Sequence, residues 1–163
     1  MREIMLASAG DKTEILKLYK MQLGREFCPW DEHYPEMDNI EFDLERDNLI
    51  IMKERGSIIA AISIDVDEQV DRLECWSDDL KPGGELARLA VHPQFQNQSI
   101  ARKMIKSTMK LMVDRGYRSV HFLVNKYNDK ALNSYRKLGF NKVGECFMYE
   151  QPFYCYEKEL VKI

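Results

Sequence analysis

Hydrophobic positions at the centre of the chain follow first the spacing of a buried strand and then that of an amphipathic helix. Residues 86–91 are apolar except for Arg88, and Pro93 ends the run because proline has a fixed φ and no backbone N–H. Six later apolar residues recur at helical spacing, with bases on the remaining face: Ile100, Met104, Ile105, Met109, Leu111 and Met112. The pattern therefore predicts a strand that ends near His92, a turn, and a helix that begins near Ser99.

The N-terminal part of the chain shows the same two spacings. Residues 2–7 are a short strand candidate, and the β-branched runs 49–52 and 58–66, which a turn sequence separates, should form a hairpin. A helix is expected after Asp11, which has a glutamate three residues later as in a capping box. An irregular loop, with a short helix up to Arg46, should lead from this helix to the hairpin.

The C-terminal part predicts a second core strand over residues 119–124 and a shorter helix over 128–138. Because this strand follows the central strand through a helix, the two should be adjacent and parallel. Residues 142–149 and 153–159 should form a terminal hairpin that turns around Gln151-Pro152.

Length and composition limit the class of protein. A chain of 163 residues fits one domain over residues 1–163, and a net charge of −3 gives no general reason to expect nucleic-acid or membrane binding. No apolar run is long enough to cross a bilayer and the N-terminus does not read as a signal peptide, so a cytoplasmic location is expected. The cysteines lack the Cys-x-x-Cys spacing of a zinc site and read as reduced thiols: Cys28, Cys75, Cys146 and Cys155.

The turn at residues 96–101 suits a phosphate group, because the unpaired amides of the following helix and the positive end of its dipole attract an anion. This turn resembles the acetyl-CoA-binding signature of the Gcn5-related N-acetyltransferase family, Gln/Arg-x-x-Gly-x-Gly/Ala preceded by Val-x-Pro. The matching residues are Val91, Pro93, Gln96 and Ala101.

Two residues of the turn depart from that signature. The family has glycine at the position of Ser99 and commonly also at that of Asn97. Asparagine tolerates the left-handed conformation better than most residues, and a serine hydroxyl can cap a helix or bond a phosphate. The alternative to a coenzyme site is an ordinary capped turn between a strand and a helix.

A second stretch resembles the family's Asn-x-x-Ala-x-x-x-Tyr-x-x-x-Gly-Phe pattern at Asn128, Ala131, Tyr135, Gly139 and Phe140. The resemblance implies that Tyr135 protonates the departing thiolate of the coenzyme, which a phenol can do because its pKa is near that of a thiol. It also implies that Asn128 contacts the coenzyme. The alternatives are a core tyrosine with its hydroxyl bonded to the backbone, and a helix cap at Asn128.

Glu85 precedes Gln96 by eleven positions, a spacing that the resemblance links to a glutamate acting as general base. An amine arrives mostly protonated and must lose a proton before it attacks a thioester, and a carboxylate can accept that proton directly or through water. A solvated acid is the alternative. Glu32 and His33 are weaker candidates for the base.

The resemblance further implies that the two parallel strands splay apart and that a bulged central strand binds the pantetheine amides through its backbone. Arg102 and Lys103, near the helix start, could attract phosphates, although a basic helix face is more often only solvated. The coenzyme-binding residues implied are Leu89, Ala90, Val91, Gln96, Asn97, Gln98, Ser99, Ile100, Ala101, Arg102, Asn128 and Tyr135.

These features together predict an α/β (α+β) fold with a central mixed, mostly antiparallel sheet of about seven strands flanked by helices. The predicted activity is acetyl-CoA-dependent N-acetyl transfer to a primary amine by direct attack, with the oxyanion held by a backbone amide of the central strand and without a metal. The alternative is a non-catalytic acyl-CoA-binding or protein-interaction module. Nucleic-acid binding through the basic helix is disfavoured by the net acidity.

Acidic residues point to the kind of acceptor. Residues 25–38 contain five acids against Arg25, in a connection that the resemblance places on the acceptor side, and residues 65–79 contain seven acids against Arg72. Such surfaces attract a cationic small amine or a peptide amine, although they could also only solvate loops. The aromatic terminal hairpin could pair with another subunit in a homodimer.

Overall fold

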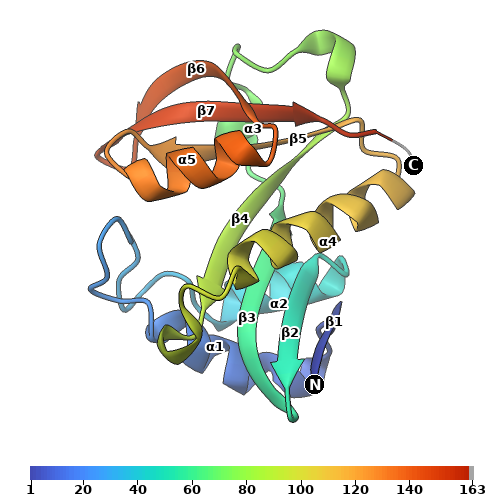
Figure 1. The fold of residues 1–163 in the computed structure, drawn as a ribbon, viewed down its shortest axis with the longest axis vertical. Helices are drawn as coiled ribbons and strands as arrows, with labels where there is room; N and C mark the ends of the chain where they lie inside the picture. The colour runs from blue at the N-terminus through green and yellow to red at the C-terminus, as the bar shows by residue number, and fades with distance from the viewer. Residues whose placement is uncertain (162–163) are drawn as a thin grey trace. The chain divides into compact units, whose positions relative to one another are not determined.

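The computed structural model describes residues 1–161. Within this range seven strands form one mixed sheet in the order β1-β2-β3-β4-β5-β7-β6, in which β4 and β5 are parallel and the other neighbours antiparallel (Figure 1). This confirms the predicted sheet flanked by helices. The strands are β1 (Arg2–Leu6), β2 (Leu49–Glu54), β3 (Ser57–Asp65), β4 (Gly83–Val91), β5 (Ser119–Asn125), β6 (Asn141–Met148) and β7 (Gln151–Glu159). The helices are α1 (Lys12–Lys20), α2 (Met37–Glu45), α3 (Glu68–Asp71), α4 (Ile100–Asp114) and α5 (Asp129–Lys137).

The chain folds into two compact units. The first unit contains residues 1–65 and 87–108, and the second contains residues 66–86 and those from 109 on. Both β4 and α4 run from one unit into the other. None of the described helices has the length and apolar character that crossing a membrane requires.

The core of the first unit packs α1 and α2 against β2 and β3. Ile15, Leu18 and Tyr19 form the apolar face of α1, and each is at most 2% exposed. They pack with Ile40 of α2 and with strand residues that include Leu49, Ile51, Ile58 and Ala61. Glu14 of α1 accepts a hydrogen bond from the backbone N–H of Ile58, which ties the helix to β3.

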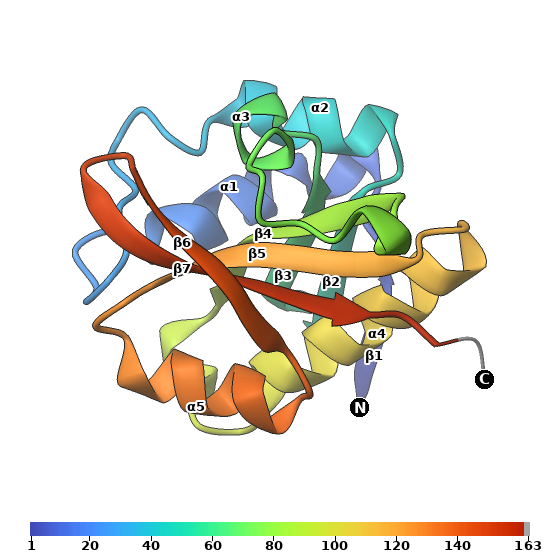
Figure 2. The ribbon, with the colours of Figure 1, turned by 90° about the horizontal axis from the view of Figure 1, so that it is seen from above.

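The second unit is built on β5, β7 and β6, which lie side by side with α5 and α3 on opposite faces (Figure 2). β5 pairs with β7 along its full length, from Ser119 opposite Glu159 to Asn125 opposite Phe153. Val70, Trp76 and Cys155 form a buried cluster on one face. All four cysteines are free thiols, as the sequence indicated.

The acidic stretch after β3 contains the short helix α3 and a 3-10 turn at Asp78–Leu80. The terminal turn differs from the position that the sequence predicted. The terminal hairpin turns at Tyr149 and Glu150, whose φ values of 52° and 61° match a two-residue turn of left-handed residues. Pro152 lies inside β7, opposite Phe147, so proline did not mark the turn here.

Candidate functional site

The turn that leads into α4 has the backbone conformation that glycine adopts most readily. Asn97 and Ser99 have φ values of 62° and 61°, in the left-handed region. Both side chains are exposed, and α4 begins at Ile100, whose own side chain is buried. The two departures from the signature therefore keep the backbone of a glycine turn at the N-terminus of a fifteen-residue helix. Amides in such a turn fit a phosphate group.

The remaining residues of the turn have defined surroundings. Gln98 is exposed and accepts a hydrogen bond from Arg2. Ala101 and Arg102 are partly exposed, whereas Lys103 is exposed. Arg102 is therefore the less solvent-exposed of the two bases and the better candidate for a phosphate contact.

Three side chains from two segments converge on the carbonyl oxygen of Val91, the last residue of β4. Gln96 Nε2 lies 3.0 Å from it, Gln22 Nε2 3.1 Å and Arg25 Nη1 3.4 Å. These donors fix the end of β4 and the start of the turn. They also leave that carbonyl little capacity for a further hydrogen bond, so Leu89 and Ala90 are the better candidates for carbonyl contacts to a pantetheine.

Arg88 interrupts the regular backbone of β4. Its φ of 49° is left-handed, as at a β-bulge, and it comes directly before Leu89. The resemblance implied a bulge at this place.

The Arg88 side chain is buried among acids of the first unit. Its guanidinium bonds both carboxylate oxygens of Asp43, at 3.0 Å each, and both of Asp65, at 3.0 and 3.1 Å. Burial opposes the charge on Arg88, but the hydrogen bonds to Asp65 and the charge of Asp43 raise its pKa. Burial raises the pKa of Asp43, an effect that the facing guanidinium opposes. From the sequence alone, Arg88 was recognised only as an interruption of an apolar run.

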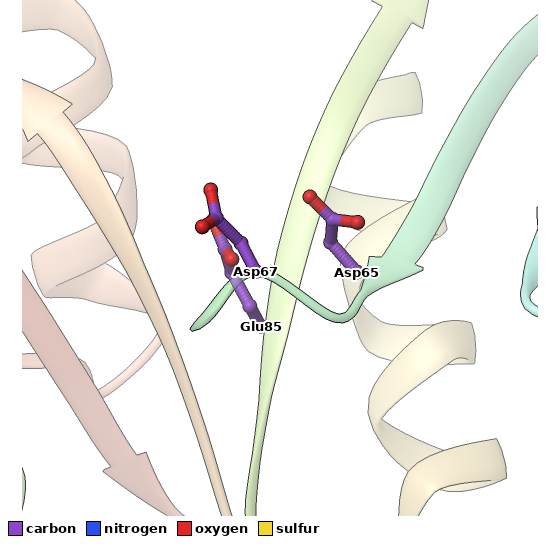
Figure 3. Close-up of side chains that lie close together, drawn as sticks. All are labelled: Asp65, Asp67 and Glu85. Carbon is purple, nitrogen blue, oxygen red and sulfur yellow. The ribbon is translucent and has the colours of Figure 1, made fainter. Parts of the chain in front are cut away.

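Glu85 lies at the head of β4, in the second unit, and is 8% exposed, so it is not the solvated acid considered from the sequence. It pairs with His121 of β5 in the last of three residue pairs that join the parallel strands. A carboxylate oxygen of Asp67 lies within 4.8 Å of one of Glu85 (Figure 3). Tyr149, in the turn between β6 and β7, donates a hydrogen bond of 3.0 Å to Asp67. Two carboxylates this close can hold one ammonium group between them.

The other acid and base candidates have less support. Glu32 and His33 are exposed, and His33 Nδ1 lies 3.8 Å from Glu36 Oε1 on the same loop. Both lack the burial of Glu85.

Tyr135 of α5 lies against two aromatic rings, edge-on to Phe122 at 4.5 Å and to Phe140 at 6.3 Å. Burial among them raises its pKa to about 12. Its hydroxyl makes no hydrogen bond within residues 1–161, so the alternative of a hydroxyl bonded to backbone does not hold there. The phenol therefore stays protonated and available as a proton donor.

Asn128 is the N-cap of α5, with its Oδ1 accepting from the backbone N–H of Ala131 at 3.2 Å. The capping role named as an alternative is thus real. It uses the side-chain oxygen and does not involve the amide nitrogen, which a coenzyme could contact.

His121 is a buried polar residue that sequence reasoning missed. Its ring stacks on Trp76 with centroids 4.3 Å apart, and Nε2 lies 3.3 Å from Asp71 Oδ1. Burial lowers its pKa to about 4, although Glu157 opposes this shift. His121 is therefore neutral near pH 7, and nothing in a single histidine within a strand run signalled its burial.

Comparisons with known proteins agree with this architecture. Residues 14–140 match the model of the acetyltransferase (GNAT) family. An acetyltransferase of Pectobacterium atrosepticum is 30% identical over 117 residues, which cover 71% of this chain and 72% of that protein. Among solved structures, a GNAT-family acetyltransferase of Listeria monocytogenes superposes with a TM-score of 0.80 at 20% identity, over 98% of this chain and 95% of that one. A Salmonella typhimurium protein solved with its cofactor acetyl-CoA gives 0.77 at 16% identity, over 100% and 96%.

The chain therefore belongs to the acetyltransferase (GNAT) family. Membership confirms the predicted fold, an acetyl-transfer activity in general, and acetyl-CoA as the acetyl donor. The left-handed turn ahead of α4 fits the phosphates of that coenzyme.

Proposed function

We propose that this protein transfers an acetyl group directly from acetyl-CoA to the primary amine of a cationic acceptor. The observation that carries the proposal is the pair of carboxylates formed by Glu85 and Asp67, with Glu85 buried at the head of β4. This pair attracts an ammonium group and offers a base to remove its proton.

The residues have distinct tasks in this reaction. Acetyl-CoA supplies an activated thioester carbonyl. The amides of residues 96–101, with Arg102, bind its pyrophosphate, and Asn128 with the backbone of Leu89–Val91 binds the rest of the coenzyme.

Proton transfer and charge stabilisation complete the mechanism. Glu85, directly or through water, takes the proton from the amine, and a backbone amide of β4 stabilises the negative charge on the carbonyl oxygen. The free amine attacks the carbonyl carbon. As the C–S bond then breaks, Tyr135 donates its proton to the departing sulfur and regains a proton from the attacking nitrogen. These steps leave N-acetylated product and free thiol, with one proton returned from Glu85 to solvent.

Ser99→Gly should bind acetyl-CoA at least as tightly as the wild type, because glycine adopts a φ of 61° without strain. Titration calorimetry gives the dissociation constant. Ser99→Ala is the matched control, since it removes the hydroxyl but keeps the Cβ. Weaker binding in both variants would mean that the hydroxyl itself holds the coenzyme and that the turn amides are not sufficient.

A panel of amines tests the proposed acceptor class. Polyamines and lysine-like amines should be acetylated in preference to neutral or anionic ones, and their kcat/KM should fall with salt, which screens charges beyond about 10 Å at ordinary ionic strength. Asp67→Asn should reduce this preference. A rate for a polycation that is indifferent to salt would contradict the proposal, and acetyl-CoA binding without turnover on any amine would favour a non-catalytic module.

A further inference from the structure

The guanidinium of Arg88 joins three segments of the first unit. It contacts Asp43 on α2 and Asp65 at the end of β3, and its Nη1 also donates to the hydroxyl of Tyr34 at 3.0 Å. The side chains of Arg88 and Asp43 are 5% and 1% exposed. A planar guanidinium bonded on several sides and excluded from water has one orientation, which a flexible lysine ammonium would not reproduce.

The same residue shapes β4. A left-handed φ is unfavourable for arginine, and such a residue persists only where its surroundings hold it in place. The bonds to Asp43 and Asp65 provide that hold. Because Leu89 follows directly, the orientation of Arg88 sets the direction of the strand edge that we assign to the coenzyme.

Tyr34 brings the loop of residues 25–36 to this point. Backbone hydrogen bonds in both directions between Asp31 and Tyr34 form a tight turn, with Tyr34 41% exposed. Trp30 anchors the same loop by packing edge-on against Tyr19, with ring centroids 5.5 Å apart. The Tyr34 hydroxyl thus links an otherwise solvent-facing acidic loop to a buried cation.

We propose that Arg88 is a positioning residue that aligns the acidic loop of residues 25–36 with the coenzyme-binding edge of β4, and that Tyr34 transmits this alignment to the acceptor. The proposal rests on the proposed function, since it takes the loop as part of the acceptor site. Arg88 acts through its neighbours and needs no contact with either substrate.

Tyr34→Phe removes only the hydroxyl and leaves the buried ion pairs intact, so it is the decisive variant. In the free protein, backbone amides of residues 28–36 should exchange hydrogen faster than in the wild type. The acceptor KM should rise roughly tenfold, as expected for a lost hydrogen bond to a charged group, with kcat and the acetyl-CoA dissociation constant unchanged. Tyr127→Phe, at a tyrosine that is 71% exposed, is the matched control and should change none of these.

Arg88→Lys should raise the acceptor KM at least as much and also lower kcat, because the strand edge shifts as well. The double variant should have the same acceptor KM as Arg88→Lys alone, because both substitutions disrupt the same interaction between Arg88 and Tyr34. The proposal would be overturned if Tyr34→Phe changed neither the hydrogen exchange of the loop amides nor the acceptor KM, or changed only one of them. Additive effects on KM in the double variant would also overturn it. A wild type that binds no acetyl-CoA would instead overturn the proposed function, and hydrogen exchange would still report on the link between Arg88 and the loop.

Discussion

Replacing Tyr135 with phenylalanine should lower the turnover number for acetyl transfer roughly 10²- to 10⁴-fold, the range of a lost general acid. The ring contacts with Phe122 and Phe140 survive the change, so the affinity for acetyl-CoA should stay nearly constant. Because the pKa of Tyr135 is raised to about 12, the wild-type phenol remains protonated from neutral pH to well above it. The loss should therefore be similar at every pH from about 7 to 10. Steady-state kinetics across this range, with calorimetry of coenzyme binding, measures both quantities.

Tyr127→Phe again serves as a control, because it removes a hydroxyl from an exposed ring. An unchanged turnover number in Tyr135→Phe would reduce Tyr135 to a packing residue or show that water supplies the proton. Glu85→Gln in the same assay tests the other proton transfer, the removal of a proton from the amine. A retained rate there would assign the base to a chain of water molecules.

Acidification from pH 7 to pH 5 should cost this protein about 2 kcal/mol of unfolding free energy through His121 alone. Folding lowers the pKa of His121 from its ordinary value of 6.5 to about 4. Between these two values the unfolded chain binds a proton that the folded chain does not, so stability falls as the pH falls. Three acids neighbour its ring: Asp71, Glu85 opposite it on β4, and Glu157 opposite it on β7. The charge of Glu157 raises the pKa of His121 but does not offset the effect of burial.

Urea titrations of the wild type and of His121→Gln at both pH values measure this contribution. The variant should lose less stability than the wild type on acidification, whatever its stability at pH 7. His33→Gln is the control, because the side chain of His33 is 86% exposed. Equal losses in His121→Gln and the wild type would show that another group dominates the acid sensitivity.

The sequence predicted correctly those helix and strand ends that are determined by residues close to them in the chain. Pro93 and the spacing of apolar residues placed the end of β4 and the start of α4 within about one residue of the structure. The Asn128 cap was also visible in the sequence. The terminal turn was misplaced because Tyr149 and Glu150 adopt left-handed φ values without glycine, so the usual turn signal was absent.

Long-range contacts account for what the sequence did not predict. The partners of Arg88, Asp43 and Asp65, lie 45 and 23 residues away along the chain. One arginine within an apolar run indicates that a charge is buried there, but it does not indicate which acids compensate it. The donors on the Val91 carbonyl were missed for the same reason, since Gln22 is 69 residues distant.

β6 is the outermost strand at one end of the sheet, and such an edge is where chains can join by adding strands to one another. Its pairing with β7 slips between Lys142 and Gly144, and Lys142 and Glu145 are exposed. An irregular edge with outward charges is a poor template for a further strand, which protects the protein from edge-to-edge aggregation. Self-association through this hairpin would therefore have to bury the rings of Phe147 and Tyr149, which are 71% and 58% exposed, and could not rely on extending the sheet.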